Sequence, residues 1–360
     1  MATGRAEGTG TVDDDTELLP AVGAAAPRRG RGRRIVAVLV ALVLLLVLLV
    51  VGTVFAVSEG LGNNITRVPG AFAGIDEATR PAVSDSLTFL LVGTDTRSDV
   101  PTTGTDADGG VGRDRSDVLM VATVDPARTT ASVVSIPRDS WVEIPGHGMN
   151  KINAAYALGG PSLLIRTVEN LTQLRVDHFG VIDFAGFESM VDAVGGIDVS
   201  VSEATSNGGV DFRQGLNHLD GAGALLFVRQ RYGLAAGDLD RAQRQQAALR
   251  ALLSKAASGG TFANPAAFYG LLDATTRSVG VDDTLTNGGL RALALEMTGL
   301  RASGVTFLLA PVTGVGDEGD QSVVYLDRVA AADLWNAVRE GRGADYAVAH
   351  PEDALGPVTR

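Results

Sequence analysis

Two aspartates stand where short apolar runs of the chain begin or end. Asp95, in the pentapeptide GTDTR, follows the run 87–92, and Asp117 precedes the run 118–124. Side chains at the ends of neighbouring strands meet at one edge of a sheet, where ligand sites form in open α/β sheets. Two carboxylates there suit a hard cation such as Mg²⁺, which takes oxygen ligands and keeps places for water and phosphate oxygens. Each Asp taken alone is more typical of a turn or a helix cap.

A pair of arginines has the spacing of an anion site. In the segment VRQR (228–231), Arg229 and Arg231 are two positions apart, and in an extended segment such residues point to the same side. Two guanidinium groups aimed together bind phosphate oxygens bidentately, which lysine cannot reproduce. The same segment is compatible with two surface arginines on an edge strand, so its interpretation depends on the neighbouring motifs.

A helix expected at 238–257 carries three polar residues on one face. Asp238, Arg241 and Gln245 are spaced i, i+3 and i+7, which keeps them within about 60° of one another around the helix. Beside them runs an apolar stripe that is expected to face the core: Ala242, Leu249 and Leu253. Polar groups that border a buried stripe are expected to lie over a pocket. The alternative is an exposed pair of Asp238 and Arg241, which would stabilise the helix by only roughly a few tenths of a kcal/mol.

Composition excludes several classes of function. The formal net charge of −12 over 360 residues leaves no global positive field to concentrate nucleic acid. The chain has no cysteine for disulfides, zinc or thiol catalysis, and no GxxxxGK[ST] loop for nucleoside triphosphates. Arginines gathered beside carboxylates in such an acidic chain instead predict a local site for a polyanion and a metal, and pyrophosphate fits both. These arginines are Arg115, Arg138, Arg229, Arg231 and Arg241.

The elements that must position these residues alternate along the chain. Short, turn-bounded, β-branched runs predict strands at 87–93, 118–124, 131–136, 178–182, 197–201, 305–310 and 322–326. Helices are expected at 161–174, 184–194, 238–257, 265–277, 284–299 and 328–341. The mixture predicts a layered α/β/α domain. Residues 98–112 have the composition of a surface loop and are interpreted as an insertion.

The N-terminal part predicts a membrane anchor. Residues 1–34 show no apolar period and are expected to form a disordered tail. The uncharged segment 35–57 would span roughly 35 Å as a helix, enough to cross a hydrocarbon core of about 30 Å. Five arginines stand just before it and only Glu59 just after, so the tail is expected in the cytoplasm and the rest of the chain outside. A cleaved signal peptide is the alternative, but its apolar region is typically about 7–15 residues.

Taken together and in order, the motifs resemble the LytR-CpsA-Psr family of cell-wall proteins. The resemblance covers roughly residues 84–345, with 58–83 as a linker to the membrane segment and 346–360 as a C-terminal tail. The motifs are GTDTR (93–97), RSD (115–117), SIPRDSWVEIPG (135–146), KINAAY (151–156), GG (159–160), VDAVGGIDV (191–199), LDGAGALLFVRQR (219–231) and GDLDRAQRQQ (237–246).

The resemblance implies a fold and an activity. The fold is a three-layer α/β/α sandwich with a mixed central sheet, preceded by one transmembrane helix, in a single-pass protein of the cell membrane. The activity is transfer of a glycopolymer phosphate from a polyprenyl-pyrophosphate carrier to peptidoglycan, assisted by Mg²⁺ or by Mn²⁺ in its place. Such a protein would contact the lipid-linked glycopolymer, peptidoglycan and the membrane, but no nucleic acid. A polyprenyl-pyrophosphate hydrolase and a non-catalytic lipid-binding regulator of the envelope remain alternatives.

The resemblance also implies roles for single residues. Asp95 and Asp117 would hold the metal, and Asp238 would orient arginines. The hydrocarbon tail of the carrier needs an apolar slot between sheet and helices. The residues expected in catalysis are Asp95, Asp117, Arg138, Arg229 and Arg231. The residues expected to bind the pyrophosphate are Arg115, Arg138, Lys151, Arg229, Arg231, Asp238, Arg241 and Gln245. Relative to compact members of the family, the insertion 98–112 lengthens the link between the first two motifs.

Overall fold

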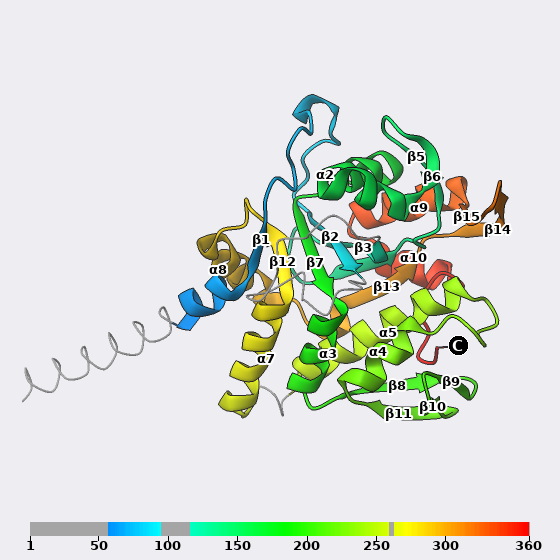
Figure 1. Cartoon of the computed structure of the whole chain (residues 1–360). Coiled ribbons are helices and arrows are strands. Elements are labelled where there is room, and N and C mark those ends of the chain that lie inside the picture. Colours follow the sequence, from blue (N-terminus) through cyan, green and yellow to red (C-terminus); the bar gives the residue numbers. More distant parts are fainter. Residues whose placement is uncertain (1–56, 95–115, 259–262, 360) are drawn as a thin grey trace, which may run out of the picture. The chain divides into compact units, whose positions relative to one another are not determined.

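The structure, a computed structural model, describes residues 57–94, 116–258 and 263–359. Within them a seven-stranded sheet forms the centre of the fold (Figure 1). Its strands, in spatial order, are β1 (Thr66–Val68), β12 (Val279–Asp282), β7 (His178–Asp183), β2 (Leu87–Thr94), β3 (Ser116–Val124), β4 (Ala131–Ser135) and β13 (Val305–Leu309). The pairs β1/β12, β2/β7 and β4/β13 are parallel, whereas β12/β7, β2/β3 and β3/β4 are antiparallel. The expected mixed sheet is therefore confirmed.

Helices cover both faces of this sheet (Figure 1). One face is covered by α2 (Ile152–Thr172), α9 (Arg328–Arg339) and α10 (Gly343–Ala349). The other side carries α3 (Phe184–Ala193), α4 (Gly221–Arg229), α5 (Asp238–Ala256) and α7 (Pro265–Ser278). The shorter α8 (Asn287–Glu296) follows β12 in the chain.

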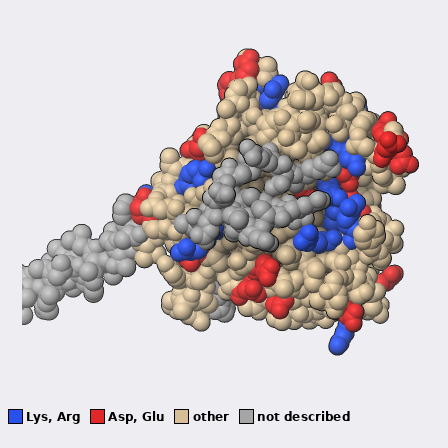
Figure 2. Space-filling view, in the orientation of Figure 1, with Lys and Arg blue, Asp and Glu red and all other residues tan. Residues whose placement is uncertain are grey.

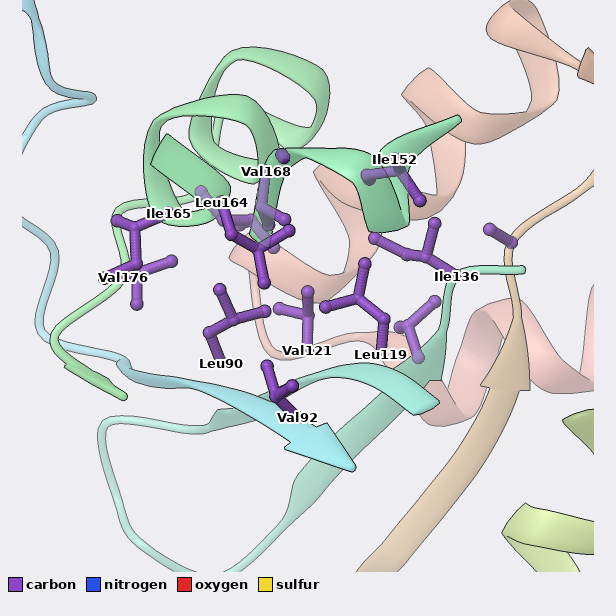
Figure 3. Packing of buried hydrophobic residues seen from close by; sticks show 14 of the residues in the cluster. Leu90, Val92, Leu119, Val121, Ile136, Ile152, Leu164, Ile165, Val168 and Val176 are labelled. Atoms are coloured by element: carbon purple, nitrogen blue, oxygen red, sulfur yellow. The ribbon is translucent and has the colours of Figure 1, made fainter. Parts of the chain in front are cut away.

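Strand alternation divides the core between the two faces. Leu90 and Val92 of β2 are buried under α2, where they join side chains from β3 and from the helix (Figure 3). Their neighbour Leu91 belongs to a cluster on the opposite face, which includes Leu249 of α5. Successive side chains of a strand point to opposite faces, so a fully apolar run such as LTFLLVG is suited to a sheet covered on both sides.

Four small antiparallel pairs surround the central sheet. They are β5 (Trp141–Ile144) with β6 (Gly148–Lys151), β8 (Ile197–Val201) with β11 (Gly215–Leu219), β9 (Thr205–Asn207) with β10 (Val210–Phe212), and β14 (Val312–Glu318) with β15 (Gln321–Leu326). The pair β8/β11 packs with α3, α4 and α5 around a second apolar core, in which Phe212 and Phe227 are fully buried.

Helix α2 differs from its predicted extent of 161–174. It begins at Ile152, and its two parts are joined by a kink at Gly159 and Gly160. Gly160 has φ 63° and ψ −158°, a backbone conformation that only glycine adopts at low cost, and Pro161 begins the second part. The motif GG therefore marks a bend inside the helical segment.

Two further predictions about helices were wrong. The helices α4 and α10 were not predicted at all. In α5, Ala242 and Leu249 pack inward as expected, but Leu253 is 37% exposed and Leu252 is buried. A small rotation of the helix face accounts for this, because residues 252 and 253 lie about 100° apart around a helix axis.

Several predictions fall outside the described residues. These are the tail 1–34, the membrane segment 35–57 except Val57, the insertion 98–112, and the site residues Asp95 and Arg115. Within the described residues, no helix combines the length and hydropathy that a membrane crossing needs.

Candidate active site

The ends of three elements bring charged side chains together. Strand β3 begins at Ser116, whose register partner is Thr94 at the end of β2, and this places Asp117 at the edge of the sheet. Beyond the end of β4, the chain continues into Arg138 and Asp139. On the opposite side, α5 begins at Asp238.

Arg138 connects the acidic residues of this cluster. Its Nη1 donates a hydrogen bond to Asp117, while its Nε lies 3.6 Å from Oδ2 of Asp139 and 3.7 Å from Oδ2 of Asp238. Burial lowers the pKa of Arg138, but the three carboxylates outweigh burial and raise it. The side chain therefore stays charged, with only 16% of it exposed.

Asp238 holds two further arginines. Its Oδ1 accepts a hydrogen bond from Nε of Arg231 at 2.9 Å, and its Oδ2 accepts one from Nη2 of Arg241 at 3.2 Å. Burial and the nearby charge of Arg138 lower the pKa of Arg241 to about 10, against the opposing effect of Asp238, which leaves it protonated at neutral pH. The pair of Asp238 and Arg241 expected from the helix spacing is thus present, and Arg241 is buried.

Asp139 belongs to the cluster although the sequence reasoning missed it. Its Oδ1 lies 3.2 Å from Nζ of Lys151. Burial and a hydrogen bond with Asp238 raise the pKa of Asp139, and the same hydrogen bond helps the arginines to lower the pKa of Asp238 against its burial. The sequence feature that could have identified Asp139 is its position directly after Arg138 in the motif SIPRD.

Arg229 and Arg231 do not lie on one extended segment, so the geometry expected for VRQR was wrong. Helix α4 ends at Arg229, and Gln230 after it has an extended conformation. The guanidinium of Arg229 lies 4.9 Å from the centre of the Phe184 ring, at the start of α3. The structure thus places Arg231 in the cluster, where it contacts Asp238. Arg229 lies instead over the ring of Phe184.

An apolar cavity of about 220 Å³ adjoins the cluster between the sheet and α3, α4 and α5. Leu91, Val118 and Met120 line it from the sheet, and Phe184, Phe187, Met190, Leu249 and Leu252 line it from the helices. Gln245 also lines it and donates to the carbonyl of Val228 at 3.4 Å. Gln245 follows Arg241 by one helical turn, so the cavity and the charged cluster meet along α5. The expected apolar slot is present.

The surface reflects this arrangement. Figure 2 shows one larger group of Lys and Arg side chains beside the grey atoms, with other basic side chains scattered over the same face, although the chain as a whole is acidic. A local cationic region on a protein of net charge −12 attracts anions at short range, because salt screens the distant negative charges over about 8–10 Å.

The sequence also matches known proteins. The pattern that defines the LytR_cpsA_psr family matches residues 66–340, a range that contains the whole charged cluster. The chain belongs to the LytR_cpsA_psr family.

Two relatives and one solved structure extend this result. The "Probable cell wall biosynthesis protein LcpB" of Corynebacterium glutamicum is 39% identical over 271 residues, which are 73% of this chain and 63% of that protein. The polyisoprenyl-teichoic acid–peptidoglycan teichoic acid transferase TagU of Oceanobacillus iheyensis is 39% identical over 180 residues, 48% of this chain and 52% of that protein. The match therefore spans less than two thirds of either relative. The crystal structure of B. subtilis TagV, 27% identical, superposes with a TM-score of 0.57 over 72% of this chain and 98% of TagV.

Several oxygen atoms at one edge of the sheet of this LytR_cpsA_psr domain could serve as ligands of a divalent cation. The hydroxyls of Thr94 and Ser116 are buried and have no hydrogen-bond partner among the described residues. They lie at the paired strand ends next to Asp117. Hydroxyl and carboxylate oxygens are ligands that Mg²⁺ accepts.

Proposed function

We propose that this protein is a membrane-anchored phosphotransferase that moves a glycopolymer phosphate from a polyprenyl-pyrophosphate carrier to peptidoglycan. Membership of the LytR_cpsA_psr family supports the proposal, as does the name of the TagU relative, a polyisoprenyl-teichoic acid–peptidoglycan teichoic acid transferase. The protein would be held in the cell membrane by the segment 35–57, with the N-terminus in the cytoplasm and the domain outside.

One observation carries the proposal: a cluster of arginines lies directly beside an apolar cavity. Arg241 belongs to the cluster and Gln245, one turn later on α5, lines the cavity. At the other side Phe184 lines the cavity while the guanidinium of Arg229 lies over its ring. A ligand with a phosphate head and a hydrocarbon tail matches both parts at once, since guanidiniums bind phosphate oxygens and apolar walls exclude water.

The residues of the cluster suggest how transfer occurs. Phosphoryl transfer depends mainly on positioning and on neutralising charge. Arg138, Arg231 and Arg241 would hold the pyrophosphate oxygens, and Asp238 keeps the last two in place. The acceptor hydroxyl forms a bond to the glycan-side phosphorus, and the bond from that phosphorus to the bridging oxygen breaks, releasing polyprenyl phosphate.

The proton of the acceptor hydroxyl needs a base. Asp139 is the carboxyl of the described cluster whose pKa is raised, and it lies beside both Lys151 and Arg138. We assign it this role. When bound to Asp117 and Asp95, with the hydroxyls of Thr94 and Ser116 nearby, Mg²⁺ or Mn²⁺ would supply positive charge to the phosphate oxygens.

Reconstituted transfer from a lipid-linked glycopolymer to peptidoglycan tests the proposal. Arg231→Ala and Arg229→Ala are each expected to lower the rate by about 100-fold or more, the size of effect seen when one charge-stabilising donor is removed. Arg213→Ala, at an exposed arginine outside the cluster, serves as the matched control. Circular dichroism would verify folding of all three. Wild-type rates in both cluster variants would refute the site, and release of free glycan phosphate without acceptor would identify a hydrolase instead.

A further inference from the structure

A second and larger cavity, of about 560 Å³, lies on the other face of the sheet. It is enclosed by α2, α9, the β5–β6 hairpin and β15, which lie together on one side of the fold (Figure 1). None of its lining residues lines the apolar cavity described above. We name it the aromatic cavity, after Trp141, Trp335 and Tyr325 in its walls.

The walls of the aromatic cavity combine flat rings with few charges. Trp141 and Trp335 are the only two tryptophans of the chain. Trp335 is 3% exposed, and its indole Nε1 finds no hydrogen-bond partner among the described residues. Of the lining residues, only Arg328 and Glu143 are charged. The indole N–H is itself buried, so Trp335 contributes the apolar part of its ring to the wall.

These walls suit the face of a sugar ring. A pyranose has an apolar C–H face and a rim of hydroxyls, and aromatic side chains offer an apolar, electron-rich face with polar groups at the edge. A polyphosphate would need the cations that are gathered elsewhere, and a prenyl chain would desolvate the polar side chains of Glu143, Asn170 and Arg328 in the walls. Mostly apolar walls with a few polar groups are the usual composition of a pocket for a small organic ligand.

The aromatic cavity adjoins the charged cluster. Trp141 stands directly opposite Lys151 in the β5–β6 pair, so the two side chains lie on the same face of the hairpin. Lys151 in turn contacts Asp139. From the other strand, the backbone N–H of Val324 donates to the carbonyl of Asp139 at 2.9 Å, and Tyr325 follows immediately. Asp139 therefore stands two residues before Trp141 in the chain and is hydrogen-bonded through its backbone to the strand that carries Tyr325.

We propose that the aromatic cavity binds a pyranose ring of the acceptor glycan and presents its hydroxyl to Asp139. This inference rests on the proposed function. In phosphoryl transfer the attacking and leaving oxygens lie roughly in line with phosphorus. The leaving group carries the prenyl chain, which the apolar cavity holds on the α5 face of the sheet. The attacking hydroxyl must then arrive from the opposite side, where the aromatic cavity lies.

Tryptophan fluorescence tests this directly, because both tryptophans line the cavity. The full chain in detergent would be titrated with a soluble β-1,4-linked tetrasaccharide of alternating N-acetylglucosamine and N-acetylmuramic acid. Saturable quenching is expected. In the transfer assay, Trp141→Ala is expected to raise the KM for this acceptor by about tenfold, since truncating a central aromatic anchor typically costs more than 1 kcal/mol, with the KM for the lipid donor unchanged. Tyr269→Ala, at a half-exposed aromatic that lines neither cavity, is the control.

Each other outcome overturns the proposal. Absence of quenching by the tetrasaccharide, or a rise in donor KM alone for Trp141→Ala, excludes an acceptor site. Quenching by a fragment of the donor glycan in place of the tetrasaccharide assigns the cavity to the donor. The fluorescence titration measures binding of the tetrasaccharide without any transfer, so its result does not depend on whether the proposed function is correct. That function fails if wild-type protein transfers nothing to peptidoglycan, whatever the tryptophans report.

Discussion

Arg244 and Gln230 are joined inside the protein, where Nη1 of Arg244 donates to Oε1 of Gln230 at 2.7 Å. Arg244 is completely buried and lies over the rings of Phe227 and Phe212, 4.5 and 5.7 Å from their centres. Gln230 is the residue between the two arginines of VRQR. A buried guanidinium thus fixes the backbone from which Arg231 reaches Asp238.

Replacing Arg244 should therefore affect stability as well as activity. Arg244→Ala leaves Gln230 without its charged donor and opens a void between two phenylalanines. We expect the free energy of unfolding to fall by about 3 kcal/mol, as for a lost buried hydrogen bond to a charged group plus a cavity. Urea denaturation of the full chain in detergent would measure it. Arg213→Ala, on the surface of the same region, should change stability by less than about 0.5 kcal/mol. Equal stability of the two variants would contradict this prediction.

The decrease of the transfer rate at acidic pH should report the protonation of Asp139. Burial and the hydrogen bond with Asp238 raise the pKa of Asp139, so its carboxyl stays protonated above the ordinary aspartate value of about 3.9. As pH rises through the raised pKa, the carboxylate forms and the rate should increase. Asp139→Asn should lower the rate by about 10²–10⁴-fold and abolish this dependence on pH, while Asp211→Asn, at an exposed site on β10, should preserve it. An unchanged pH profile in Asp139→Asn would assign the base elsewhere.

Removal of divalent metal should slow transfer strongly. We expect a chelator to lower the rate by about 100-fold or more, because a metal that polarises a phosphoryl oxygen contributes several kcal/mol. Asp117→Asn should weaken binding of Mn²⁺ alone, measured by calorimetry without substrate. An unaffected rate in chelator, or unaltered Mn²⁺ binding in the variant, would remove Asp117 from the metal site.

The central strands could be predicted because local rules and tertiary structure agree there. Runs such as 87–93 and 131–136 are apolar, β-branched and bounded by turns, and they form β2 and β4 with little change of bounds. The spacing of Asp238 and Arg241 on α5 likewise needs only helix geometry. The family resemblance rested on such motifs, and the match over residues 66–340 confirms it.

Helix α4 shows why the rest could not be predicted. Its sequence contains Gly221 and Gly223, and glycine disfavours helix, so local propensity does not predict a helix there. In the structure a Cβ on Gly221 would lie 2.5 Å from the backbone oxygen of Glu188, so the glycine allows α3 and α4 to pack closely. Burial of Phe227 then outweighs the poor helix propensity. The aromatic cavity could not be predicted for a related reason, because Trp141 and Trp335 are distant in sequence and come together only in the folded protein.

A single helix allows a matched test of the apolar cavity. Leu249 of α5 lines the cavity, whereas Leu253, one turn later, is 37% exposed and does not. Leu249→Trp would place an indole in a space of about 220 Å³ and compete with the prenyl chain. We expect the KM for the lipid-linked donor to rise by about tenfold or more in Leu249→Trp, and to stay unchanged in Leu253→Trp. The KM for the acceptor should stay constant in both, because the acceptor is assigned to the opposite face of the sheet. Equal donor KM values in the two variants would show that the hydrocarbon chain binds elsewhere.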